Sequence, residues 1–286
     1  MMHLNLKGFS AIGILSIGIF SFTGCSVSNA KPPSTSTTTT QLIGSGSSTS
    51  VSTTPGSGSN GGAPVPPSGA TVISNIQNQT GWQTCGGCGN DGGTGQGPVY
   101  NLTQGIASPA LSGSSADFWI AGGPAYSGGY YFIEQPTVPN PLSYLRYEFD
   151  LYIPGQYASA PQALEFECQQ NSEGYTYNYA WQADYDSKSW RVFNYTTKHW
   201  EPTSVGFQPF APDTWHHIIA IYHASGTQVM HDSITVDGVT YPVNITHDAL
   251  FTGNGLELTN AFQVDLDASS SPYHIYLDNM TVSLKD

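Results

Sequence analysis

The sequence predicts an all-β fold, a two-sheet antiparallel β-sandwich that follows an N-terminal segment without regular structure. Apolar and polar residues alternate with a period of two in many short segments after residue 140. Turn signals separate these segments, and Asp237-Gly238 is the strongest of them. Helical periodicity is hard to find in this region, so we expect short strands joined by turns and stacked as two sheets.

The expected strands follow one another at short intervals. The alternation is cleanest in 163–169, where Glu165, Glu167 and Gln169 face one side and the apolar residues between them face the other. In 175–181 every second residue is aromatic, and Tyr177, Tyr179 and Trp181 share one face. The other expected strands are 145–153, 190–193, 215–223, 230–236, 239–244, 261–266 and 274–284.

Residues 1–24 are typical of a signal peptide. Lys7 supplies a positive start, and the apolar run 8–22 is too short to span a bilayer comfortably. The run ends in Phe22-Thr23-Gly24-Cys25, which resembles the bacterial lipobox, although leucine is usual where Phe22 stands. This resemblance implies a lipoprotein whose lipid is attached to Cys25. Ser26 is not the aspartate associated with retention in the inner membrane, so we expect an envelope protein anchored in the outer membrane, facing the periplasm or the exterior.

Residues 25–71 are expected to form a disordered tether. Serine, threonine, glycine and proline dominate, and Lys31 is the single charged residue in 26–70. Such a segment buries too little apolar surface to offset the entropy lost on ordering. Residues 72–286 then form one domain of a size that suits a sandwich.

The charge of the domain excludes some partners. All 20 acidic residues lie after position 90, against five lysines and arginines in 72–286, which leaves 15 net negative charges. Nucleic acids need basic contacts to their phosphates, so we expect no nucleic acid partner. The same charge argues, less strongly, against acidic polysaccharides.

Three cysteines remain after Cys25. Cys85 and Cys88 lack the second pair that a zinc site needs, and the two glycines between them are a poor helix start for a redox motif. In an exported protein we predict a small disulfide between Cys85 and Cys88. Cys168 is then unpaired and buried.

Four stretches resemble concanavalin A-like lectin/glucanase domains and, more narrowly, an uncharacterised group of exported bacterial jelly-roll domains. They are Gln162-Ala163-Leu164-Glu165-Phe166-Glu167, Trp215-His216-His217-Ile218, Asp237-Gly238-Val239-Thr240-Tyr241 and Tyr276-Leu277-Asp278-Asn279-Met280-Thr281-Val282. The resemblance covers nearly all of 80–286. It implies a concanavalin A-like jelly roll with one sheet bent into a groove that commonly holds glycans.

Glu165 and Glu167 are the sharpest candidates for chemistry. They leave one face of a strand roughly 7 Å apart, and paired carboxylates hydrolyse glycosides. The strand resembles that of laminarinase-type glucanases, Glu-x-Asp-x-x-Glu, which implies Glu165 as nucleophile. The acid/base position falls at Gln170, or at Gln169 without a bulge, and glutamine transfers no proton. A polar face that binds a ligand is therefore favoured over a catalytic one.

The aromatic stripe of 175–181 has two interpretations. It lines the groove, where aromatic faces stack on sugar rings, or it lies in the core. A structural calcium is a weaker expectation. Asp278 is its candidate ligand, because this fold class often holds calcium near its terminal strands. No other cofactor is expected.

The sequence thus predicts non-catalytic binding of a neutral polysaccharide or oligosaccharide at the cell surface. The residues expected to bind it are Glu165, Glu167, Gln169, Tyr177, Tyr179 and Trp181. The alternatives are a glycoside hydrolase that uses Glu165 and Glu167 with a relocated acid, and a structural or adhesive surface protein. A proton donor opposite Glu165 across the groove would favour the hydrolase.

Overall fold

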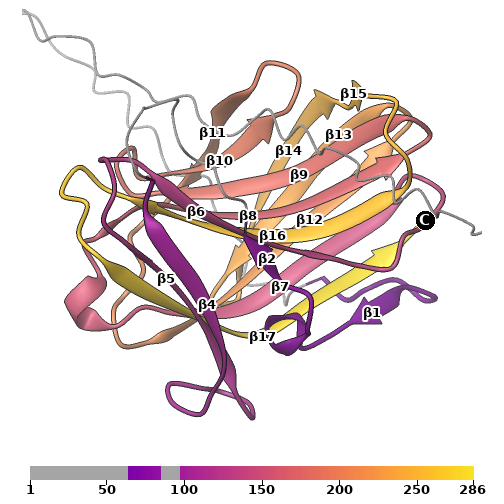
Figure 1. Cartoon of the computed structure of the whole chain (residues 1–286). Coiled ribbons are helices and arrows are strands. Elements are labelled where there is room, and N and C mark those ends of the chain that lie inside the picture. Colours follow the sequence, from indigo (N-terminus) through magenta and orange to yellow (C-terminus); the bar gives the residue numbers. More distant parts are fainter. Residues whose placement is uncertain (1–63, 85–96) are drawn as a thin grey trace, which may run out of the picture.

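The computed structural model describes residues 64–84 and 97–286, which form a sandwich of two antiparallel sheets (Figure 1). The predicted all-β fold is confirmed. Cys25, Cys85 and Cys88 lie outside the described residues, so the lipid anchor and the Cys85–Cys88 disulfide stay predictions. In the described part of the chain, no helix is long and apolar enough to cross a membrane.

The first sheet has the strand order β14-β13-β12-β7-β17-β5-β4, and β1 adds to β17. Its strands are β1 (Thr71–Ile73), β4 (Val99–Ile106), β5 (Ser115–Ala121), β7 (Tyr144–Tyr152), β12 (Trp215–Ser225), β13 (Gln228–Val236), β14 (Val239–Asp248) and β17 (Tyr273–Lys285). The short 3-10 helices η1 (Ile76–Asn78) and η2 (Gly155–Tyr157) lie in connections that lead from this sheet to the second one. β1 begins one residue before the predicted domain boundary.

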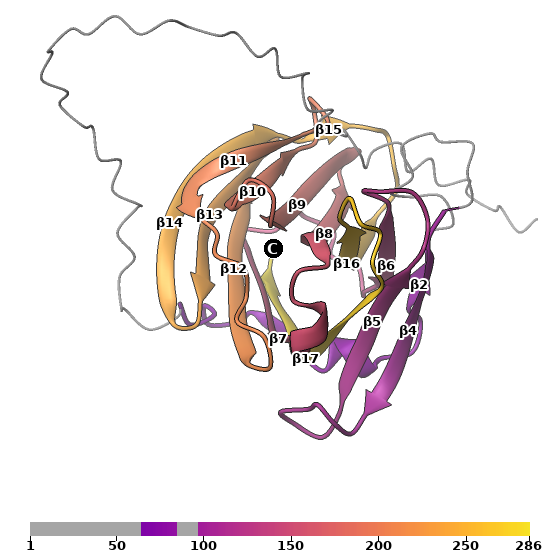
Figure 2. The same ribbon diagram turned by 90° about the vertical axis from the view of Figure 1, so that its left-hand side faces the viewer.

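The second sheet has the order β11-β10-β9-β8-β16-β6-β2, and β15 adds to β9. Its strands are β2 (Gln83–Thr84), β6 (Gly128–Glu134), β8 (Pro161–Ser172), β9 (Tyr175–Asp184), β10 (Ser189–Asn194), β11 (His199–Gly206), β15 (Leu250–Phe251) and β16 (Glu257–Leu266). Figure 2 shows the two sheets curving over one another. Strands β1, β2, β4, β5, β6, β11 and β15 were not predicted as elements.

Two tight turns set the register of the hairpins. Asp237 and Gly238 have φ of 50° and 81° and join β13 to β14 as a two-residue loop, as predicted. Glu173 and Gly174, with φ of 53° and 80°, join β8 to β9 in the same way. The second turn pairs Glu165 with Gln182, and this pairing decides which side chains share a face with the acidic pair.

The core lies between the sheets and is rich in aromatic rings. Phe149 of the first sheet meets Phe166 of the second at 5.1 Å between ring centroids, and Phe118 meets Phe262 at 5.2 Å. Cys168 is fully buried there and is a free thiol, as predicted for this residue. Apolar burial of this kind is the main stabilising term for the sandwich.

Candidate functional site: the outward face of the second sheet

The acidic pair lies on the outward face of the second sheet, away from the core. Leu164 and Phe166 point between the sheets, so Glu165 and Glu167 point out, as the alternation predicts. Gln169 follows on the same side and pairs with Asn178 of β9 and Thr259 of β16. We call this surface the second-sheet face.

The aromatic stripe lies in the core, so its expected role in stacking on sugars is wrong. Tyr179 and Trp181 have no exposed surface, and Tyr177 is 1% exposed. Tyr179 and Trp181 both contact Tyr222 of the first sheet, with centroids 5.6 and 6.2 Å apart. The cause is the Glu173-Gly174 turn. Because it pairs Glu165 with Gln182, the neighbouring Trp181 must point the other way.

Small and amide side chains surround the two glutamates instead. Glu167 stands between Ala180 of β9 and Ala261 of β16 in the register. Glu165 stands between Gln182 and Gln263. The alanines leave the Glu167 side chain without a bulky cross-strand neighbour, whereas the glutamines offer hydrogen bonds to Glu165.

A third carboxyl group, that of Asp265, joins the pair. Asp265 lies on β16, diagonally across from Glu165, because Glu165 pairs with Gln263 in the register. Burial raises the pKa of Glu165 well above its ordinary value, and the charges of Asp265 and Glu167 add to the effect.

The pKa of Glu167 is also raised. Burial raises its pKa to about 7, against hydrogen bonds from Asn178 and Tyr130 that favour the ionised form. The second-sheet face therefore carries two neighbouring carboxyl groups with raised pKa values, and the pKa of Glu167 lies near neutral pH.

The amide side chains on the second-sheet face direct their N–H groups at the acids. Gln182 Nε2 donates to Glu165 Oε1 at 2.7 Å, and Gln263 Nε2 donates to Asp265 Oδ1 at 2.9 Å. The oxygens that remain have no hydrogen-bond partner in the structure, namely Glu165 Oε2, Asn178 Oδ1 and Gln263 Oε1. Three buried acceptors on one patch call for a ligand rich in donors.

Aromatic rings flank the acidic group formed by Glu165, Glu167 and Asp265 on both sides. Tyr130 and Phe132 of β6 lie beyond β16, with centroids 6.1 Å apart. Phe193 and Trp200 lie on the other side as a cross-strand pair of β10 and β11, 5.1 Å apart. Sequence reasoning identified neither of these pairs, because their places depend on how β6 and β11 join the sheet.

The nearby arginine is engaged in an ion pair. Arg191 contacts Asp184 at 3.0 Å, and it also donates to Gln182 at a long 3.5 Å. Both contacts join the Arg191 guanidinium to side chains of the same sheet. The second-sheet face thus remains a surface of carboxyl and amide groups rather than a cationic one.

The likeness to a glucanase strand ends at its last acid. The β8–β9 register runs without a bulge, so the position in question is Gln169, on the second-sheet face. Gln170 points inward, where its amide binds the backbone of Asn140 and Leu142. Neither glutamine supplies a proton.

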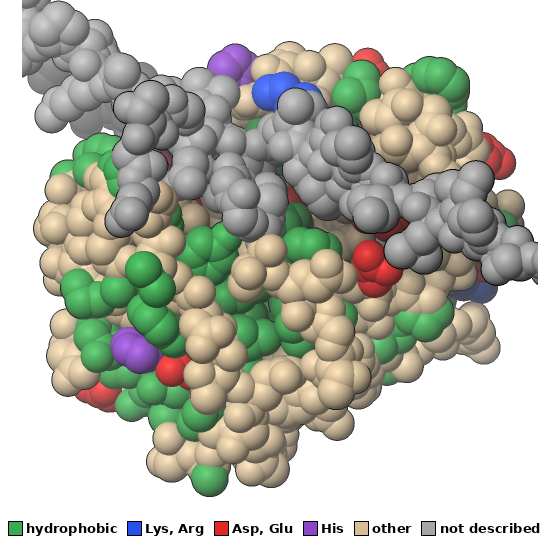
Figure 3. All heavy atoms as spheres, viewed as in Figure 1, with side chains coloured by type: hydrophobic (Ala, Val, Ile, Leu, Met, Phe, Trp, Pro, Cys, Tyr) green, Lys and Arg blue, Asp and Glu red, His purple; other side chains and the backbone are tan. Residues whose placement is uncertain are grey.

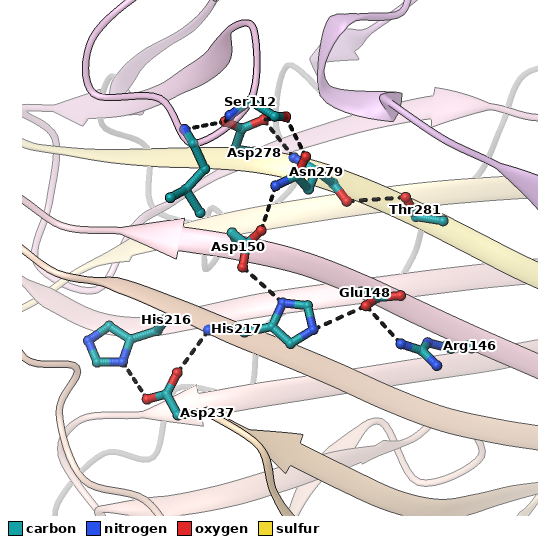
Figure 4. Close-up of polar contacts among 11 residues, drawn as sticks. Ser112, Arg146, Glu148, Asp150, His216, His217, Asp237, Asp278, Asn279 and Thr281 are labelled. Carbon is teal, nitrogen blue, oxygen red and sulfur yellow. Dashed lines mark hydrogen bonds and ion pairs between the residues drawn. The ribbon is translucent and has the colours of Figure 1, made fainter. Parts of the chain in front are cut away.

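Asp278 is occupied by hydrogen-bond donors, which does not fit the expected calcium ligand. Its two oxygens accept from the backbone N–H groups of Leu111, Ser112 and Asn279 at 2.7–2.9 Å, and from the Gln77 amide at 3.1 Å. Figure 4 shows Asp278 and Ser112 at one end of a polar network that runs past Asp150 to His217. Among the described residues, no group of three or more potential ligands is arranged for a metal.

Comparisons with known proteins give a fold-level likeness only. No family model and no curated protein matches the chain. The chain is similar to the solved structure of the cellulose induced protein Cip1, with a TM-score of 0.46, 12% identity, and coverage of 73% of this chain and 96% of that one. An endo-1,3-beta-glucanase from Streptomyces sioyaensis is similar with a TM-score of 0.42 and 15% identity, and the match covers 78% of this chain and 100% of that one. A carbohydrate esterase from the Shiga toxin-encoding bacteriophage phi24B has a TM-score of 0.44 and 14% identity, and the match covers 76% of this chain and 100% of that one. Similarity this low transfers no residue's role.

Proposed function

We propose that the second-sheet face binds a neutral glycan without cleaving it. The observation that carries the proposal is the set of three partnerless acceptors around the acids, Glu165 Oε2, Asn178 Oδ1 and Gln263 Oε1. A sugar presents several hydroxyl donors within a few ångströms of one another, which is the donor-rich ligand these oxygens require.

The surroundings of the acceptors support the same ligand. The ring pairs Tyr130–Phe132 and Phe193–Trp200 flank the acids and offer apolar faces to sugar rings. The negative charge of the domain and the engaged Arg191 disfavour an anionic glycan. A neutral chain that crosses the strands meets rings at both ends and hydrogen-bonding groups in the middle.

A glycan array followed by calorimetry on the isolated domain tests the proposal. We expect Glu167→Ala and Asn178→Ala to weaken binding by about 1–3 kcal/mol each, and the matched control Glu173→Gln, at the exposed hairpin tip, to leave it unchanged. Binding by the parent with no released sugar supports a binder. Failure to bind any neutral glycan, or equal binding by all variants, contradicts the proposal.

A glycoside hydrolase is the second candidate, and the grouping of Glu165, Glu167 and Asp265 on one face favours it. Burial and the charges of Asp265 and Glu167 raise the pKa of Glu165, which suits a general acid, and Glu167 lies roughly 7 Å along the strand. Product analysis separates the two functions. In a hydrolase, Glu165→Gln abolishes sugar release while ground-state binding persists, because an amide is neither a nucleophile nor a proton donor of the required strength.

We also propose that the domain is held to the cell envelope by a lipid on Cys25, with the outer membrane as its place. The support is the sequence Thr23-Gly24-Cys25 followed by a charge-poor segment. Cell fractionation of Cys25→Ser tests this. The parent should pellet with membranes and the variant should not, and a variant that stays with the membranes contradicts the anchor.

A further inference from the structure

A row of aromatic side chains crosses the outward face of the first sheet, opposite to the second-sheet face. The strand register aligns Trp215 of β12 with Tyr152 of β7, and Tyr152 with Tyr276 of β17. Two residues along β17, His274 pairs with Trp119 of β5. We call these five residues the aromatic row. It crosses four neighbouring strands, roughly 15 Å at the usual strand spacing.

The rings of the aromatic row contact one another in sequence. The centroid distances are 5.3 Å for Trp215–Tyr152, 6.2 Å for Tyr152–Tyr276, 6.5 Å for Tyr276–His274 and 6.1 Å for His274–Trp119. At the β5 end the ring planes are close to parallel, 16° between His274 and Tyr276 and 27° between His274 and Trp119. Tyr157 of η2 adds a ring 5.1 Å from His274.

All five residues of the row are only partly buried, so the rings remain accessible. Figure 3 shows hydrophobic side chains gathered around a histidine near β5 and η2. Side chains that serve the core of this sandwich are instead fully buried, as Trp181 is. A continuous strip of half-exposed rings is a common mark of an interaction surface.

The polar edges of the rings are available to a ligand. His274 Nδ1 is held by Asp117 at 2.9 Å, and Tyr152 Oη donates to Asp213 at 3.1 Å. These two contacts fix ring orientations. Among the described residues, none is hydrogen-bonded to the ring N–H of Trp119 or Trp215 or to the O–H of Tyr276. The row therefore presents stacking faces together with free donors, which suits pyranose rings.

The charge beside the row selects a neutral occupant. Asp117 and Asp213 lie along it, and the row itself and its cross-strand neighbours contain no lysine or arginine among the described residues. A polyanion would meet carboxylates without a cation. The length of the strip suits a chain of several sugar units rather than one ring.

We infer that the aromatic row is a second glycan-binding site, which takes a neutral polysaccharide chain laid across β12, β7, β17 and β5. The site does not depend on the second-sheet face. Stacking of sugar rings on the aromatic row provides the affinity.

Retention of the isolated domain on insoluble cellulose, xylan, mannan and β-1,3-glucan tests the inference. We expect retention of the parent on at least one of these, and a loss of about tenfold in affinity for Trp119→Ala and for Trp215→Ala. Phe251→Ala is the matched control, since Phe251 is 68% exposed and outside the row. Tyr157→Ala covers the case in which a tryptophan variant fails to fold, because Tyr157 lies outside the strands.

Glu167→Ala distinguishes this site from the proposed function. A variant that loses soluble glycan on the second-sheet face but stays on the insoluble polysaccharide supports two sites. Retention that is lost with Glu167→Ala and kept in the row variants overturns the inference. It is also overturned if the parent is retained on none of the four polymers, or if the row variants change only the mass of the particle in solution, which would make the row a contact between copies.

Discussion

Gly128 lies directly beneath the carboxylate of Asp265. The two residues are paired in the β6–β16 register, and a Cβ atom at position 128 would collide with Asp265 Oδ1. Because Gly128 has no side chain, strand β6 leaves room for the Asp265 carboxylate beside Glu165. A glycine in a strand interior normally costs stability, so its presence here points to this close approach.

Gly128→Ala should displace Asp265 and weaken glycan binding by about tenfold. The new methyl group pushes the carboxylate off Glu165, which disturbs the acceptors around it. Gly206→Ala is the control, because nothing lies within 4 Å of the corresponding Cβ. Calorimetry with the glycan found for the parent measures the effect, and equal affinities for both variants would count against a role for Asp265.

Stability should fall as pH rises from about 4.5 to 7, with Glu167 as one cause. Its pKa is about 7 in the folded state, above the ordinary value of 4.5, so the native state binds more protons than the unfolded state in this window. The free energy of unfolding therefore decreases by about 3 kcal/mol for this group as pH rises to about 7, and is constant at higher pH. Urea unfolding at pH 5 and pH 7.5 should show a smaller difference for Glu167→Gln than for the parent. An unchanged difference would mean that Glu167 titrates normally.

His217 should contribute stability that is lost only in alkaline solution. Its ring lies between Asp150 at 2.8 Å and Glu148 at 3.1 Å, and these hydrogen bonds raise its pKa to about 9 (Figure 4). The contribution is complete below about pH 6.5 and disappears as pH rises through 9. The side chain is 39% exposed, so we expect about 1 kcal/mol after allowing for solvent screening.

Melting temperatures of the parent and His217→Gln at pH 6 and pH 10 measure this contribution. The two proteins should differ at pH 6 and converge at pH 10. His199→Gln, at an exposed position, is the control. A gap that persists at pH 10 would assign the effect to packing.

Asp278→Asn should destabilise the domain by about 3 kcal/mol. The amide N–H₂ would face N–H groups of Leu111, Ser112 or Asn279, each of which now donates to the carboxylate. Asp248→Asn, at an exposed position, should be neutral. The melting temperature of the parent should be the same with calcium and with a chelator. A higher melting temperature with calcium would indicate that Asp278 is a metal ligand.

The local pattern of the sequence was enough for the fold and for one strand of the site. Alternation in 163–169 placed Glu165 and Glu167 on the outward side correctly, because side-chain direction in a strand follows a period of two. The stripe in 175–181 alternates equally well, so its pattern left two orientations open. The Glu173-Gly174 turn held the answer, since a two-residue hairpin fixes the pairing of Glu165 with Gln182.

The rest of the site depends on contacts between distant segments. Asp265 meets Glu165 across 100 positions, through the pairing of β16 with β8. Asp278 is surrounded by donors from 77, 111 and 112, which loops bring to β17. Neither arrangement follows from spacing along the chain.

The pairing of β1 with β17 determines how a pull on the preceding chain enters the domain. Three residues, Thr71 to Ile73, join the sheet there, with help from Lys285, which donates to the backbone of Ser68. β17 in turn lies in the centre of the first sheet and is bonded to β7 and β5. A pull on the segment before residue 71 would separate the short β1 from β17 before the rest of the first sheet bears the load. Loss of the β1–β17 pairing would lengthen the segment that precedes the domain and leave the other strands of the sandwich paired.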